Sequence, residues 1–161
     1  MCYWHSRMRR WLVALLGLVG AGAFAVSVQA GRWWVIEGAV EIGPHKSWRC
    51  FSGDCVPAGM SWIGAGPQWE RFGIATWAAG LLSALILVVL AATVASGRAP
   101  KLLAKMAIVS VLTALAASTM FVAKFPGLEG AALDRGAWLY IIGMVLGGTL
   151  AISTLRTPSA A

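Results

Sequence analysis

Two cysteines in the one long polar stretch of the sequence are the residues best suited to carry chemistry. Cys50 and Cys55 are separated by Phe-Ser-Gly-Asp, which contains a turn-type sequence. This spacing favours a structural disulfide across a hairpin. A reactive thiol pair more often has the Cys-x-x-Cys spacing at a helix N-terminus. A membrane thiol-disulfide oxidoreductase, or its accessory, that uses Cys50 and Cys55 is therefore the alternative reading.

A metal site drawn from the two cysteines with His45 and Asp54 has weaker support. One histidine and a cysteine pair that can oxidise make a poor zinc ligand set, so we expect no metal and no other cofactor. The apolar segments of the chain carry scattered Ser and Thr but no central charge. Membrane enzymes and pumps place ionisable groups inside such segments. We therefore expect no catalytic residue and no enzymatic activity.

Composition indicates an integral membrane protein. Of 161 residues, 59% are hydrophobic and 12% are charged, and the mean hydropathy is +0.76, outside the range of soluble domains. Four segments approach the length of about 20 residues that crosses a hydrocarbon core. We predict a four-helix transmembrane bundle that forms one membrane domain over residues 1–161, with spans at 11–29, 72–96, 102–124 and 138–155.

The first 30 residues also contain the parts of a secretory signal. Cleavage after Ala30 is the alternative to the retained first helix that we expect. In both cases residues 31–71 form a polar subdomain between the first two spans.

The charged residues separate onto two sides of the predicted bundle. Basic residues alone flank one set of span ends: Arg7, Arg9, Arg10, Arg98, Lys101, Lys105 and Arg156. The other side holds every acidic residue: Glu37, Glu41, Asp54, Glu70, Glu129 and Asp134. The positive-inside bias places both termini in the cytoplasm and loop 31–71 outside the plasma (inner) membrane. The basic side can meet anionic membrane lipid. We expect no nucleic-acid partner, because the net charge of +7 is spread over span ends and forms no clustered binding face.

The polar loop predicts a small antiparallel sheet. Apolar and polar residues alternate over 32–37 and 38–42, and the segments on either side of Ser52-Gly53-Asp54 predict a second hairpin stapled by the disulfide. The tryptophans of the loop predict the core of this sheet and an interfacial belt, with an adhesive or ligand-binding face as the alternative: Trp33, Trp34, Trp48 and Trp62. Trp69 is expected at the membrane interface with Trp62.

A pair of glycines marks the fourth span. Gly143 and Gly147 form a GxxxG pattern, which allows two helix backbones to approach closely. The contact is either within the bundle or between copies of the chain, and the sequence leaves both possibilities open.

The layout of the chain resembles the claudin and peripheral-myelin-protein superfamily. In claudins the first outer loop carries a Trp, then Gly-Leu-Trp-x-x-Cys, then a second Cys. Trp33 or Trp34 matches the first Trp, Trp48 the second, and Cys50 and Cys55 the cysteine pair. Arg71 stands where claudins carry an Arg at the start of the second span. The spacing differs, since one residue rather than two separates Trp48 from Cys50, and the cysteines are closer together.

The resemblance implies a left-handed four-helix bundle, a loop sheet clamped by a disulfide, lateral self-association, and a barrier, adhesion or auxiliary-subunit role. We therefore expect a non-enzymatic membrane protein that acts through lateral or extracytoplasmic contacts, as a homo-oligomer or with a membrane-protein partner. A small-solute pore or transporter component is a further alternative.

Overall fold

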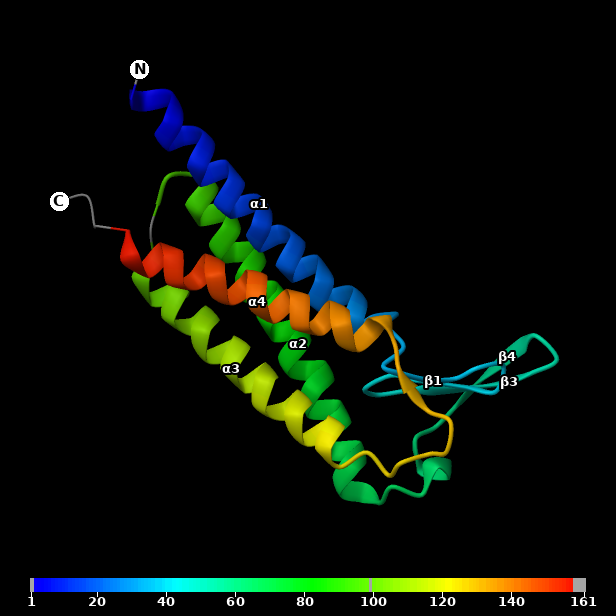
Figure 1. The fold of residues 1–161 in the computed structure, drawn as a ribbon. Coiled ribbons are helices and arrows are strands. Elements are labelled where there is room, and N and C mark those ends of the chain that lie inside the picture. Colours follow the sequence, from blue (N-terminus) through cyan, green and yellow to red (C-terminus); the bar gives the residue numbers. More distant parts are fainter. Residues whose placement is uncertain (1, 99, 158–161) are drawn as a thin grey trace.

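Four long helices account for most of the residues that the structure describes. The computed structural model describes residues 2–98 and 100–157, without the side chains of residues 2–7 and 9. The helices are α1 (Cys2–Gln29), α2 (Pro67–Ala95), α3 (Lys101–Ala123) and α4 (Arg135–Arg156) (Figure 1). Each is long and apolar enough to cross a membrane. The prediction of four membrane-length helices is therefore confirmed, and each helix begins before its predicted span.

The start of α2 shows why this helix is longer than its apolar segment. The helix begins at Pro67 rather than at residue 72, with Gly66 as its N-cap and Glu70 in its first turn. Proline is well suited to the first helical position, because an N–H group there would have no acceptor within the helix, so that its absence costs no hydrogen bond. An acidic side chain in the first turn is stabilised by the helix dipole. Hydropathy detects the apolar part of this helix but not its polar first turn.

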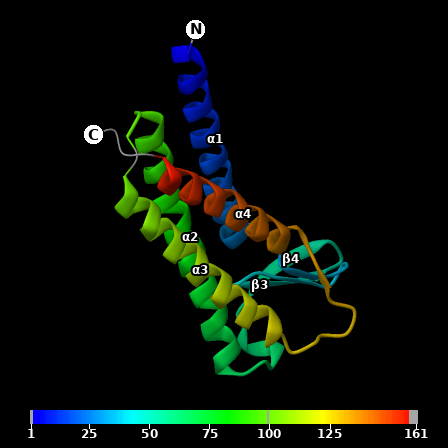
Figure 2. The same ribbon diagram turned by 60° about the vertical axis from the view of Figure 1, so that its left-hand side comes forward.

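The helices form a bundle in which α1 and α3 each pack against both α2 and α4. Figures 1 and 2 show that α1 begins and α4 ends at the end of the bundle away from the sheet. We call this the terminal end, and the opposite one the sheet end. Large apolar side chains fill the interior, each at most 1% exposed: Phe24, Leu87, Leu90, Tyr140 and Leu150. Others cover the outer surface, including Leu85, Leu102, Val109 and Val145, all above 60% exposed. An apolar exterior of this size fits helices that lie in lipid.

Five short strands form one antiparallel sheet beyond the end of the bundle (Figure 1). Their order is β4-β3-β2-β1-β5. Four come from the loop between α1 and α2: β1 (Trp34–Ile36), β2 (Val40–Ile42), β3 (Ser47–Phe51) and β4 (Asp54–Ala58). The fifth, β5 (Ala132–Leu133), comes from the loop between α3 and α4 and pairs with β1. The sequence predicted the first four strands but not β5, because a two-residue strand carries no periodicity.

The predicted second hairpin is present and closes with a tight turn. Phe51 pairs with Asp54, so Ser52 and Gly53 alone form the loop between β3 and β4. Both have a positive φ, +52° and +94°. This is the backbone of a type I′ hairpin turn, whose twist matches that of the flanking strands. The turn therefore sets the register that places Cys50 opposite Cys55.

Candidate functional site

The disulfide joins the two strands at one edge of the sheet. Cys50 on β3 is bonded to Cys55 on β4, and the two residues are direct cross-strand partners. Cys50 is 9% exposed, whereas Cys55 lies on the exposed edge strand. The bridge thus staples a hairpin, as the residue spacing predicted.

We predict that Cys50→Ser lowers the free energy of unfolding of the hairpin by about 2 kcal/mol, because the bond closes a short loop and constrains the unfolded chain modestly. Limited proteolysis of the folded protein would measure this, since a loosened hairpin is cut faster between Phe51 and Asp54. Helical content measured by circular dichroism serves as the control and should stay constant. Equal cleavage rates in the two proteins would contradict the prediction.

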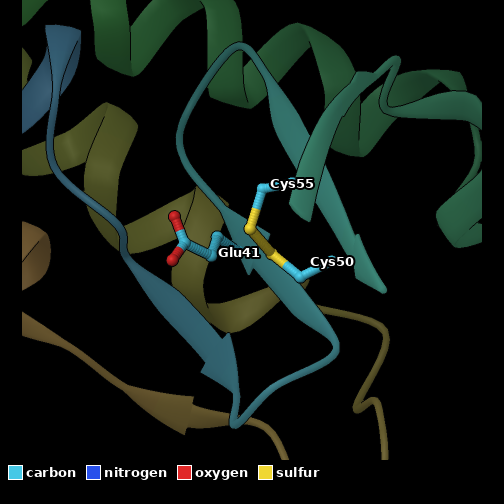
Figure 3. A group of neighbouring side chains, drawn as sticks. All are labelled: Glu41, Cys50 and Cys55. Carbon is cyan, nitrogen blue, oxygen red and sulfur yellow. A yellow bond between two sulfur atoms is a disulfide. The ribbon is translucent and has the colours of Figure 1, made fainter. Parts of the chain in front are cut away.

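A carboxylate lies beside the disulfide. Ligand atoms of Glu41, Cys50 and Cys55 all lie within 4.8 Å of one another, and Figure 3 shows the three side chains. Bonded sulfurs are not the thiolates that bind zinc, and the Glu41 carboxylate accepts a hydrogen bond from Arg32. In its disulfide form this group therefore offers no thiolate to a metal ion. Of the four metal ligands that the sequence suggested, only the two cysteines belong to this group. Glu41 is its third member, and His45 and Asp54 are not part of it.

Arg32 connects the two loops at the sheet end. Its guanidinium donates to Glu41 on β2, and its Nε lies 2.9 Å from Oδ2 of Asp134, the N-cap residue of α4. The hydrogen bond to Glu41 raises the pKa of the guanidinium above its ordinary value. The backbone of the same residue accepts a hydrogen bond of 2.7 Å from the N–H of Gly136. One residue thereby holds the sheet against the start of α4.

An aromatic cluster fills the junction between sheet and bundle. Trp33 and Trp34 are 1% and 4% exposed, and the side chains packed around them come from α2, α3, α4 and the loop after α3. Trp34 stacks on Phe125 with ring centroids 4.3 Å apart. Further members of the cluster are Trp69, Phe121 and Tyr140. Trp33 and Trp34 therefore pack between the sheet and the helices and help to hold the two together.

Trp69, which the sequence led us to expect at the membrane interface, is buried inside the protein. Its side chain is 1% exposed, its ring stacks on Phe121 at 4.8 Å, and its indole N–H donates to the carbonyl oxygen of Phe121 at 3.0 Å. A Trp that finds both an aromatic neighbour and a buried acceptor is more stable inside the protein than at a surface. Since α2 begins at Pro67, Trp69 lies in its first turn and faces α3.

The other residues singled out from the sequence lie at the surface or near it. Trp48 is half-buried on β3 beneath the ammonium of Lys46, which is 4.8 Å from the ring centroid. Trp62 donates to Ser47 Oγ at 2.9 Å and carries the Arg49 guanidinium over its ring. Arg71 is exposed near the start of α2. Trp33 and Trp34 thus lie in the aromatic cluster, whereas Trp48 and Arg71 lie outside it.

Gly143 and Gly147 lie at contacts inside the bundle. A Cβ atom at Gly143 would be 2.9 Å from the Phe24 ring of α1, and one at Gly147 would be 2.6 Å from the Leu87 side chain of α2. Both glycines are buried. Of the two possibilities that the sequence left open, this structure shows the contact within the bundle.

His45 is a titratable group of the sheet end with an unusual environment. Its ring lies 5.2 Å from that of Trp77, and its buried Nδ1 has no hydrogen-bond partner among the described residues. Burial, followed by the nearby charge of Lys46, lowers the pKa of His45 below its ordinary value.

This lowered pKa predicts acid-sensitive stability. As pH falls below about 6.5, the ordinary pKa of histidine, the unfolded chain binds a proton at His45 that the folded protein resists. The folded state should therefore lose stability on acidification through this window. Thermal unfolding at pH 7.5 and pH 5.5 would show a smaller acid-induced fall in melting temperature for His45→Gln than for the unaltered protein. Equal falls would show that His45 is not responsible.

Comparison with known proteins places the chain in no family. No protein-family model matches it, and no curated protein matches it either.

Proposed function

We propose that this chain is a non-enzymatic, claudin-like integral membrane protein that acts through protein contacts made by its sheet. The supporting observation is an exposed apolar surface on the stapled hairpin. Phe51 and Val56 are 66% and 53% exposed. Exposed apolar patches of this kind on an ordered surface commonly mark sites of protein interaction.

The register of the hairpin places these side chains on a common face. Arg49 pairs with Val56, and Phe51 pairs with Asp54. Directly opposed residues project from the same side of a sheet, as do residues two apart on one strand. We call Arg49, Phe51, Asp54 and Val56 the hairpin face. It combines an aromatic and an aliphatic side chain with one charge of each sign, which suits a protein partner or a second copy of the chain.

The position of the hairpin also favours contact. β4 is the edge strand of the sheet, and Asp54 to Pro57 are all exposed. Figure 1 shows the β3–β4 hairpin projecting away from the helices. The disulfide limits the motion of this hairpin, so that less conformational entropy is lost when a partner binds.

Photo-crosslinking in native membranes tests the proposal. A benzophenone amino acid in place of Phe51 should give covalent adducts with a second copy or with one membrane-protein partner, identified by mass spectrometry. The matched control is the same substitution at Glu37, which is exposed in the turn after β1 and lies outside the hairpin face. Absence of adducts at position 51 in a folded protein that is monomeric in membranes would refute the proposal.

We further propose that the sheet end is extracytoplasmic and that both termini are cytoplasmic. The proposal rests on the basic residues at the terminal end and on the acidic residues at the sheet end. In intact cells, a membrane-impermeant maleimide should label Glu37→Cys and should not label Ser96→Cys, which lies in the turn between α2 and α3. The reverse labelling pattern would show that the sheet end is cytoplasmic and would refute this proposal.

A further inference from the structure

A groove runs along the outside of the bundle between α2 and α3. It has a volume of about 360 Å³, within the range of small-molecule sites. Its apolar walls come from both helices: Ala79, Leu82, Ile86, Met106 and Val109. Figures 1 and 2 both show α2 and α3 side by side along their length. Leu82 and Val109 are 53% and 63% exposed, so the groove opens to the surroundings of the bundle.

The hydroxyl groups in the groove are hydrogen-bonded, whereas its one charged side chain forms no ion pair with a described residue. Ser110 and Thr113 donate their hydroxyl hydrogens to carbonyl oxygens of their own helix, at 2.9 Å in each case. Lys105 is the one charged residue of the lining. The ion pairs among the described residues all involve Arg32, so Lys105 has no carboxylate partner there. The groove thus combines apolar walls with one lysine ammonium that is free to bind an anion.

Lys105 lies toward the end of the groove that suits a lipid headgroup. It is in the second turn of α3, and Figure 1 shows that α3 begins near the terminal end of the bundle. Lys101 precedes it by four residues, and residues with this spacing are neighbours on one face of a helix. The acidic residues lie elsewhere, in or next to the strands, in the first turn of α2 and in the loop after α3. The end of the groove at Lys105 is therefore positively charged, while most of the remaining wall is apolar.

We infer that this groove binds one anionic phospholipid, with an acyl chain along α2 and α3 and the headgroup phosphate at Lys105. The apolar walls match the acyl chain. The ammonium supplies the charge that distinguishes an anionic lipid from a zwitterionic one. A helix from another protein fits less well, because an apolar helix in the groove would leave the lysine without a counter-charge.

Lipid titration of the purified full-length protein tests this inference. The protein is placed in mixed micelles with phosphatidylglycerol or phosphatidylcholine, and bound lipid is counted by native mass spectrometry. Phosphatidylglycerol should be retained preferentially. Lys105→Gln should weaken its binding about fivefold, as expected for the loss of one lysine at a lipid headgroup.

Two further variants make the result specific. Lys124→Gln removes a lysine at the other end of α3 and should leave binding unchanged. Val109→Phe fills the groove without changing charge and should weaken the binding of both lipids, with a melting temperature that shows the fold is intact. Equal retention of the two lipids by the unaltered protein, or equal effects of Lys105→Gln and Lys124→Gln, would overturn the inference. A photo-crosslinking amino acid placed at position 109 that forms adducts with another protein chain would also overturn the inference.

Discussion

Replacing Trp33 with Ala should destabilise the protein by about 3 to 5 kcal/mol, the cost of removing a fully buried Trp side chain. Trp33 is 1% exposed and packs against Phe121 and Tyr140 with ring centroids 5.7 and 5.0 Å apart. Its indole N–H lies 3.2 Å from Ser27 Oγ. Truncation would leave a cavity where the sheet meets three helices. Unfolding of the detergent-solubilised protein by a denaturing detergent measures the loss.

Two controls separate the parts of this effect. Trp33→Phe keeps an aromatic ring and loses the hydrogen bond, so it should cost about 1 kcal/mol for that bond and somewhat more for lost packing. Trp138→Ala removes the same side chain from a position that is 60% exposed, where the expected change is about 0.5 kcal/mol. Comparable losses for Trp33→Ala and Trp138→Ala would show that the junction does not stabilise the fold.

Replacing Gly73 with Ala should destabilise the protein by about 3 kcal/mol, although alanine is the better helix former. A Cβ atom at this position would overlap the carbonyl oxygen of Pro44 and lie 3.0 Å from the Phe121 ring. Pro44 belongs to the backbone that enters β3, which cannot rotate away as a side chain can. The substitution must therefore shift the sheet relative to α2. Thermal unfolding in detergent measures the effect.

Gly148 provides the matched control for Gly73. It also lies within a helix, and a Cβ atom there would meet no atom within 4 Å. Gly148→Ala should leave stability unchanged or raise it by up to about 1 kcal/mol, because the helix loses a flexible residue without a clash. A melting temperature of Gly73→Ala equal to that of Gly148→Ala would contradict the close approach of α2 to Pro44.

Several features of the chain follow from local sequence patterns. Hydropathy predicted the four helices, because a run of about 20 apolar residues is an unmistakable signal. The Ser-Gly-Asp turn and the cysteine spacing predicted the β3–β4 hairpin and its disulfide. Alternating residues predicted β1 and β2. Each of these patterns depends on residues close together in the chain, so no knowledge of tertiary structure is needed to detect it.

The tertiary structure alone decided which distant residues meet. Residues separated by most of the chain, such as Trp33 and Tyr140, share one aromatic cluster. The pairing of β5 with β1 joins the two loops, and Trp69 packs against Phe121 from another helix. Composition and spacing describe how apolar a residue is and where its neighbours in sequence lie. They do not specify which faces of the helices approach, because that choice depends on how all the side chains pack together.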